Sequence, residues 1–404
     1  MKKIIAFLLT LLLLLPMVAC SKDAGSDLDP VLAARRDSAE SYMRNMCTVI
    51  WSPEEDILYT TQNKVLPEEA KENTKMQLHA DRIYRGMPYA YAGSTLNTFM
   101  EYAGESKDGV YPISGLNWKL LSGNSKNARV GVDGSSSLIL SWAQLGADIS
   151  MTSTYYMTFT RGFYPVGDYA TQEKKLEKTN LVCYDNGEQK MFASYGQLQK
   201  ADGLVKVTDE GGHAMMAVSS TVVRNEDGTI NGDESYAIIL EQTKEFFLAE
   251  EHYTDPNLGE VYTICGVDVR YSFRDLYDQG YLPITCKALT DPTPLNDVMV
   301  SDTIQAADEN NLFEGYVNSN RFIDTITFSV IDKNGDTVQQ AALRSVRGDN
   351  KEVNMTRFTK EGPELIRGSI DLSNLPEGRY ILQFTCRLID GTEYPLREGK
   401  YYQR

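Results

Sequence analysis

The sequence is poor in the residues that nucleic-acid and metal sites usually require. Its 404 residues include only 3 histidines and 6 cysteines. No two cysteines have the spacing typical of a zinc ribbon. Lys and Arg number 40 against 56 Asp and Glu, which gives a formal net charge of −16. Because phosphate binding requires a basic surface, this charge argues against nucleic acid as a partner. We expect no metal and no cofactor.

Long apolar runs are also scarce, and the clearest one lies at the N-terminus. Two lysines precede an almost continuous apolar run over residues 4–15, which is shorter than the roughly 20 residues of a membrane span and is typical of an export signal. The run leads to Met17-Val18-Ala19-Cys20. This segment resembles the lipobox of bacterial lipoproteins. The resemblance implies a signal peptide over residues 1–19, a lipid on Cys20, and a place in the bacterial cell envelope at the outer face of a membrane.

Composition divides the rest of the chain into a tether and two folded parts. Residues 20–30 contain few apolar side chains and are expected to form a flexible tether. Residues 31–289 mix helix and strand patterns, whereas residues 297–404 contain many short strands separated by turns. The segment 289–296, with its prolines, is the predicted linker. We therefore predict an α+β domain followed by a small all-β sandwich of immunoglobulin type.

Apolar periodicity and turn residues predict the individual elements. In the first domain the expected helices cover residues 31–50, 67–84, 132–145 and 272–277, with a further helix start at residues 53–56. The expected strands of that domain cover residues 204–207, 213–223 and 236–242. In the second domain the expected strands include residues 325–331, 337–343, 379–388 and 394–402.

Five scattered cysteines remain after Cys20, namely Cys47, Cys183, Cys265, Cys286 and Cys386. An odd number cannot all pair within one chain. We expect them to be small buried apolar residues, and a Cys265–Cys286 bridge stays open.

Two of the three histidines carry little functional signal. His79 lies in a charged stretch of the predicted 67–84 helix and is expected to face solvent. His252 follows two glutamates, but three adjacent donors do not converge on one ion. His213 differs because two glycines precede it at the start of an apolar strand. A histidine at such a strand edge can face a cleft and act as a base.

Four stretches of the first domain combine into one pattern: residues 84–93, 131–138, 202–218 and 238–242. The second places Asp133-Gly134-Ser135 at a helix start, where a thiol has a lowered pKa and is a ready nucleophile. The third contains His213, and the fourth ends in Glu241-Gln242. A carboxylate or amide on a neighbouring strand could hold the imidazole in one tautomer.

In this order the stretches resemble the NlpC-type cell-wall cysteine peptidases, over roughly residues 84–283. In that family Gly-x-Pro-Tyr precedes Asp-Cys-Ser at a helix start, Gly-His begins a strand, and a polar residue follows on the next strand. The resemblance implies a papain-like fold that binds peptidoglycan stem peptides. The implied roles are general base for His213, orienting residue for Glu241 or Gln242, and substrate cleft for Tyr89, Tyr91, Asp133 and Ser135.

One departure from the family concerns the reaction itself. The nucleophilic cysteine corresponds to Gly134, which has no side chain that could attack, and loss of a nucleophile removes several orders of magnitude of rate. Ser135 is a candidate substitute, but it is turned by about 100° around the helix. Either the protein is a pseudoenzyme that retains the cleft, or position 134 has been changed from Cys.

Three functions therefore stay open. The first is a cell-wall hydrolase that acts through Ser135 or a restored cysteine. The second is a binding module for muropeptides or a related peptide, without turnover. The third is a surface scaffold or adhesin in which the C-terminal sandwich does the work. The structural alternatives are a helix-capping role for the serines at 135–137 and a simple salt bridge for Glu241, since charged side chains are rarely buried without a partner.

Overall fold

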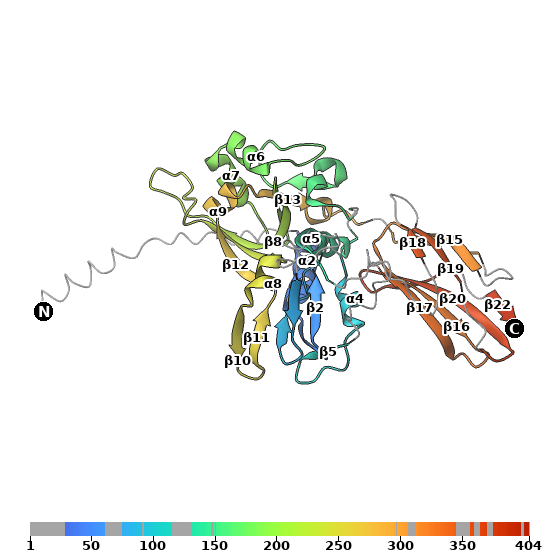
Figure 1. Ribbon diagram of the computed structural model, residues 1–404. Coiled ribbons are helices and arrows are strands. Elements are labelled where there is room, and N and C mark those ends of the chain that lie inside the picture. The colour runs from blue at the N-terminus through green and yellow to red at the C-terminus, as the bar shows by residue number, and fades with distance from the viewer. Residues whose placement is uncertain are drawn as a thin grey trace, which may run out of the picture.

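The protein is a mixed α+β structure, mostly β-sheet with few helices (Figure 1). The computed structural model describes residues 29–60, 75–90, 93–114, 131–146, 149, 151–295, 297–305, 312–344, 356–358, 364–369, 375–396 and 400–403. The predicted signal peptide over residues 1–19, the lipidation site Cys20, the tether as far as residue 28, and Tyr91 lie outside these residues. None of the described helices is both long and apolar enough to cross a membrane.

The first described element is helix α2, Pro30–Thr48, which confirms the helix predicted over residues 31–50. It begins inside the predicted tether because Asp29 caps it, accepting a hydrogen bond from the backbone N–H of Val31 at 2.8 Å. Proline fits the first helical turn, where its missing N–H costs nothing. The buried face of α2 packs against α5 and the central sheet.

The central sheet is six-stranded and antiparallel, in the order β12-β9-β8-β7-β13-β6. Its strands are β6 (Phe163–Pro165), β7 (Gly203–Thr208), β8 (Gly211–Thr221), β9 (Tyr236–Glu241), β12 (Gly266–Ser272) and β13 (Leu282–Cys286). The strands predicted over residues 204–207, 213–223 and 236–242 are confirmed as β7, β8 and β9. Helix α5, Gly134–Ala143, crosses this sheet and packs on β8.

A second sheet has the order β10-β11-β4-β1-β5, and a separate hairpin joins β2 to β3. The strands are β1 (Ile50–Pro53), β2 (Ile57–Thr60), β3 (Lys75–Leu78), β4 (Ile83–Arg85), β5 (Tyr111–Ile113), β10 (His252–Asp255) and β11 (Gly259–Thr263). The predicted helix start at residues 53–56 is therefore wrong, and so is the predicted helix over the described part of residues 67–84. The charged sequence resembles an exposed helix, but β4 pairs in parallel with the distant β11. His79 lies in the turn after β3, beside Asp56.

The other helices that the structure describes before residue 290 are short. They are α4 (Leu96–Met100), α6 (Thr179–Asn186), α7 (Glu188–Tyr195), α8 (Lys244–Ala249) and α9 (Phe273–Asp278), with 3₁₀ turns η2 (Thr154–Tyr156), η3 (Phe159–Arg161) and η4 (Lys287–Leu289). The helix predicted over residues 272–277 is confirmed as α9, which begins with a reciprocal capping box between Ser272 and Asp275. Aromatic rings join α7 to α9, with the centroids of Tyr195 and Phe273 5.6 Å apart.

Two antiparallel sheets make up the C-terminal region (Figure 1). One contains β14 (Val300–Asp302), β15 (Leu312–Ser319), β18 (Thr356–Phe358) and β19 (Glu364–Ser369). The other contains β16 (Ile323–Ile331), β17 (Thr337–Arg344), β20 (Arg379–Leu388), β21 (Glu393–Pro395) and β22 (Lys400–Gln403). Buried apolar residues from both sheets, such as Val317 and Phe328, form one cluster. The single strand predicted over residues 394–402 is wrong, because β21 and β22 pair separately with β20.

A buried carboxylate joins the two regions. Asp324, at the start of β16, is fully buried and accepts hydrogen bonds from the Thr95 hydroxyl and from Arg387 Nε at 3.0 Å. Arg387 also forms an ion pair with Glu101 at 2.7 Å. The predicted linker over residues 289–296 is likewise held, since Arg35 on α2 donates to the carbonyl oxygen of Asp291 at 2.8 Å.

The five described cysteines, Cys47, Cys183, Cys265, Cys286 and Cys386, are all buried and have free thiols. The Cys265–Cys286 bridge that the sequence left open is not formed. Burial raises the pKa of both Cys183 and Cys286 to about 12. These two thiols are therefore protonated near neutral pH and are poor nucleophiles.

Candidate functional site

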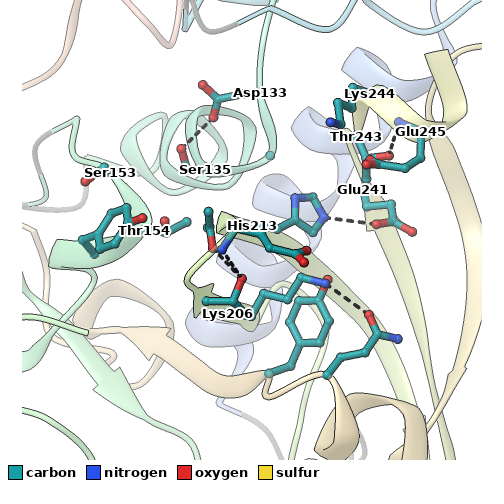
Figure 2. Close-up of a pocket in the computed structure, with 18 of the residues that line it drawn as sticks. Asp133, Ser135, Ser153, Thr154, Lys206, His213, Glu241, Thr243, Lys244 and Glu245 are labelled. Carbon is teal, nitrogen blue, oxygen red and sulfur yellow. Dashed lines mark hydrogen bonds and ion pairs between the residues drawn. The ribbon is translucent and has the colours of Figure 1, made fainter. Parts of the chain in front are cut away.

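Three elements converge on one cleft: the N-terminus of α5, the start of β8 and the end of β9. Figure 2 shows the His213 imidazole between the helix that carries Asp133 and Ser135 and the strand that carries Glu241. The cleft has a volume of about 1610 Å³. Of the residues singled out in the sequence, those that line it are Tyr89, Asp133, Gly134, Ser135, His213 and Glu241.

His213 and Glu241 form a pair in which the carboxylate is buried and the imidazole is partly exposed. Their side chains are brought together by the antiparallel pairing of β8 with β9, and His213 Nε2 lies 3.1 Å from Glu241 Oε2. The Glu241 side chain is 1% exposed, whereas the His213 side chain is 17% exposed. A carboxylate accepts hydrogen bonds, so in the neutral imidazole Nε2 carries the proton and Nδ1 keeps a lone pair.

Tyr271 on β12 satisfies the other oxygen of the same carboxylate. Its hydroxyl donates to Glu241 Oε1 at 2.8 Å. Burial and the Glu241 charge raise the pKa of Tyr271, so the phenol remains a donor. The carboxylate is thus fixed from two sides, and the imidazole that it holds is fixed with it.

Gly134 lies against the opposite edge of the imidazole. A Cβ built on this glycine would lie 2.8 Å from His213 Nδ1, 2.7 Å from His213 Cε1 and 2.4 Å from the carbonyl oxygen of Ala214. Neighbouring heavy atoms do not approach a Cβ so closely, and one of these three is rigid strand backbone. The position expected for a nucleophile is therefore adjacent to Nδ1, but atoms of β8 occupy the space that its side chain would need.

Ser135 does not replace the missing side chain. Its hydroxyl donates to Asp133 Oδ1 at 2.6 Å, and the same oxygen accepts from the backbone N–H of Ser136 at 2.9 Å. Asp133 is the N-cap of α5. Asp133 and Ser135 therefore stabilise the helix start, and the serine hydroxyl is turned toward the cap, as Figure 2 shows.

The loop before α5 is held by backbone pairing. Tyr89 forms an isolated parallel bridge with Val132, and the backbone N–H of Val132 donates to the carbonyl oxygen of Pro88 at 3.1 Å. Gln242, the alternative orienting residue, donates from its side chain to the carbonyl oxygen of Met87. Of the two polar residues at the end of β9, Glu241 lies at the imidazole and Gln242 ties down this loop.

Lys206, Thr154 and Tyr271 are among the cleft residues that sequence reasoning missed. Lys206 on β7 is the direct cross-strand partner of His213. A lysine inside the apolar strand 204–207 was the available signal. Thr154 lies so close to Gly212 that a Cβ there would meet its hydroxyl oxygen at 1.8 Å. This packing explains why glycine precedes His213. The contact with Thr154 cannot be predicted from the residues near Gly212 in the sequence.

The rim of the cleft is mainly acidic. Besides Glu241, the carboxylates that line it are Asp133, Asp209, Glu210, Glu245, Glu251 and Asp278, against the three lysines Lys178, Lys206 and Lys244. Among the described residues, no three His, Cys, Asp or Glu side chains come together in a way that could hold a metal ion. The arrangement offers an oriented imidazole in an acidic cleft, and of the described residues at the start of α5 neither Gly134 nor Ser135 presents a free nucleophile to it.

Comparison with known proteins adds little to this geometry. No family model matches the sequence, and no curated protein matches it. One solved structure, a DUF3823 family protein from Bacteroides ovatus, is similar at 12% identity and a TM-score of 0.19, with 50% of this chain and 87% of that chain covered. A TM-score this low assigns neither fold nor function.

Proposed function

We propose that this protein is a cell-envelope lipoprotein whose first domain, of the papain-like NlpC type, binds peptidoglycan stem peptides or a related peptide without cleaving them. Under this proposal Cys20 carries the lipid, and the C-terminal sheets form an immunoglobulin-like sandwich that spaces the binding domain or adds to its surface. The sequence supports the anchor, and the geometry of the cleft supports the binding role.

The site has the order of parts that a cysteine peptidase of this kind needs, apart from the nucleophile. The helix start, the imidazole and the orienting carboxylate follow one another across the cleft, with Nδ1 toward Gly134 and Nε2 toward Glu241. In a complete enzyme of this type a thiolate would form an acyl-enzyme, and the histidine would act as acid and base. Within the part of the chain that the structure describes, no cysteine lines the cleft beside His213.

The crowding at Gly134 is the single observation that carries the absence of turnover. An added Cβ would meet both the His213 ring and the backbone of Ala214. Position 134 therefore lacks both a nucleophilic side chain and the space for one. Hydrolysis through Ser135 has less support, because its hydroxyl is already bonded to Asp133. We therefore favour the pseudoenzyme over an enzyme that uses serine.

The pairing of His213 with the buried Glu241 supports a retained binding cleft. A buried charge costs several kcal/mol unless it is paired, and a hydrophobic residue at position 241 would avoid that cost. Keeping Glu241, Tyr271 and His213 together is consistent with a requirement for an oriented polar group at the cleft surface. Such a requirement would arise if a group of the ligand forms a hydrogen bond with the imidazole.

The test is to mix the purified protein with a dye-labelled stem peptide, and to follow binding by anisotropy and cleavage by mass spectrometry in the same samples. We expect saturable binding and an intact peptide. His213→Ala should weaken binding. Cleavage that is lost in Ser135→Ala would overturn the pseudoenzyme, and absence of binding would overturn the binding role.

A further inference from the structure

Building on the proposed function, we infer that Lys206 anchors a carboxylate of the bound ligand and so sets the register in which the ligand lies over His213. Lys206 lines the cleft and faces it in Figure 2, next to His213.

The strand register fixes where the ammonium lies. Lys206 on β7 pairs directly with His213 on β8, and side chains of directly opposed residues project from the same face of a sheet. A ligand group bound to Lys206 is therefore held one strand away from the imidazole.

The ammonium has neutral partners where a carboxylate would be expected. Lys206 Nζ lies 3.2 Å from Gln279 Oε1 and 4.7 Å from the centroid of the Tyr281 ring. Within the described part of the chain it forms no ion pair. An ammonium has three N–H donors, so the amide and the ring leave donor capacity directed at the cleft.

A second lysine of the cleft shows the contrast. Lys178 also lines the cleft, but it forms an ion pair with Asp209 at 3.2 Å, and its side chain is 54% exposed. Lys206 is half-buried, and burial lowers its pKa. A half-buried cation that forms no direct ion pair among the described residues is stabilised when a ligand brings an anion into contact with it.

The acidic rim makes this anchor selective. Carboxylates such as Glu210 and Glu245 also line the cleft, and they repel a ligand carboxylate that has no contact with a cation. Repulsion at the wrong positions and attraction at Lys206 together favour one register. The ligand class is therefore a peptide with a free carboxylate, and neutral or amidated peptides should be discriminated against.

The experiment compares two dye-labelled forms of one stem tripeptide, the free acid and the fully amidated peptide. We expect the protein to bind the acid at least about tenfold more tightly, as for one charge-assisted hydrogen bond. Lys206→Met should bind both peptides equally, and Lys206→Arg should retain the preference. Lys200→Met is the matched control, since Lys200 pairs with Asp37 and is not among the residues that line the cleft, and it should behave as the unmodified protein. Thermal melting establishes that each variant is folded.

The possible outcomes separate the two proposals. Equal binding of acid and amide by the unmodified protein would overturn the role of Lys206 and leave peptide binding intact. A Lys206→Met variant that weakens both peptides by the same factor would assign Lys206 a purely structural part and would also overturn the inference. Binding of neither peptide by the unmodified protein would overturn the proposed function, and the anchor with it.

Discussion

Two of the buried carboxylates, Asp202 and Glu241, differ in their surroundings. Asp202 pairs with Arg36 at 2.9 Å, and their side chains are 2% and 5% exposed. Glu241 is equally buried, but its partner His213 reaches the cleft. In the first pair, Arg36–Asp202, both side chains are buried, and we call it the sealed pair. In the second, His213–Glu241, the imidazole is exposed to the cleft and to a ligand, and we call it the open pair.

The sealed pair serves the fold. Arg36 on α2 also donates to the carbonyl oxygen of Leu289 at 3.0 Å, and Asp202 Oδ2 accepts from the backbone N–H of Gln199 at 2.8 Å. These bonds join α2, the chain before β7 and the end of the domain. A buried carboxylate therefore has two roles in this protein. Where its partner is also buried it stabilises the fold, and where its partner is exposed it orients a group at the cleft.

The largest effect is expected from breaking the sealed pair. Arg36→Met leaves Asp202 buried without its counter-charge and should lower the free energy of unfolding by about 3–5 kcal/mol, measured by urea denaturation. The peptide affinity of the folded fraction should stay unchanged. A loss below about 1 kcal/mol would show that the pair has no special weight. The double variant Arg36→Met/Asp202→Leu should recover much of the stability.

A smaller effect is expected at Gly134. Gly134→Ala forces a Cβ against His213 and the backbone of Ala214, which should cost about 1–3 kcal/mol of unfolding free energy. Gly378→Ala is the control, since the nearest atom to its Cβ would lie 3.7 Å away. Gly134→Cys should be destabilised in the same way and should not cleave stem peptides. Turnover by the Gly134→Cys variant would mean that β8 can shift enough to accommodate the cysteine side chain.

The open pair should respond mainly in binding. Glu241→Gln keeps the shape of the side chain and removes its charge, so we expect weaker peptide binding and a loss of about 1–3 kcal/mol in stability. Tyr271→Phe removes one hydrogen bond to the same carboxylate and should cost only about 0.5–1.5 kcal/mol. Calorimetric melting and anisotropy measure both quantities. If neither variant changed binding, His213 would not need its orientation.

The smallest predicted effect is a pH dependence of peptide selectivity. The preference for the free acid requires a charged Lys206, and burial lowers the pKa of this lysine, although Glu241, Glu245 and Glu210 partly oppose the shift. The preference should therefore persist at neutral pH and disappear on the alkaline side, at a pH below the ordinary lysine value of about 10.4. Binding of the amidated peptide, measured over the same range, corrects for effects on other groups such as His213.

Local patterns predicted the parts of the site that depend on nearby residues. The helix start at Asp133 and the strands around His213 and Glu241 follow from capping residues and apolar alternation, and the structure places them as expected. The second sheet was missed because β4 pairs with β11, which lies far along the chain. A charged segment that looks helical in isolation gives no sign of such a partner.

Two features of the cleft could not be predicted locally for a related reason. The crowding at Gly134 depends on the backbone of Ala214, which comes from another strand. The place of Lys206 beside His213 depends on the register between β7 and β8, and a shift by one residue would turn the lysine to the other face. Both features depend on contacts between strands, which the local sequence does not determine.

The most direct test of the account is a crystal structure of the protein soaked with a stem tripeptide in its free-acid form. The account predicts an intact peptide across the face between α5 and β8, with a carboxylate at Lys206 Nζ and a polar group at the His213 ring. A cleaved peptide, or an intact one bound elsewhere on the molecule, would contradict it.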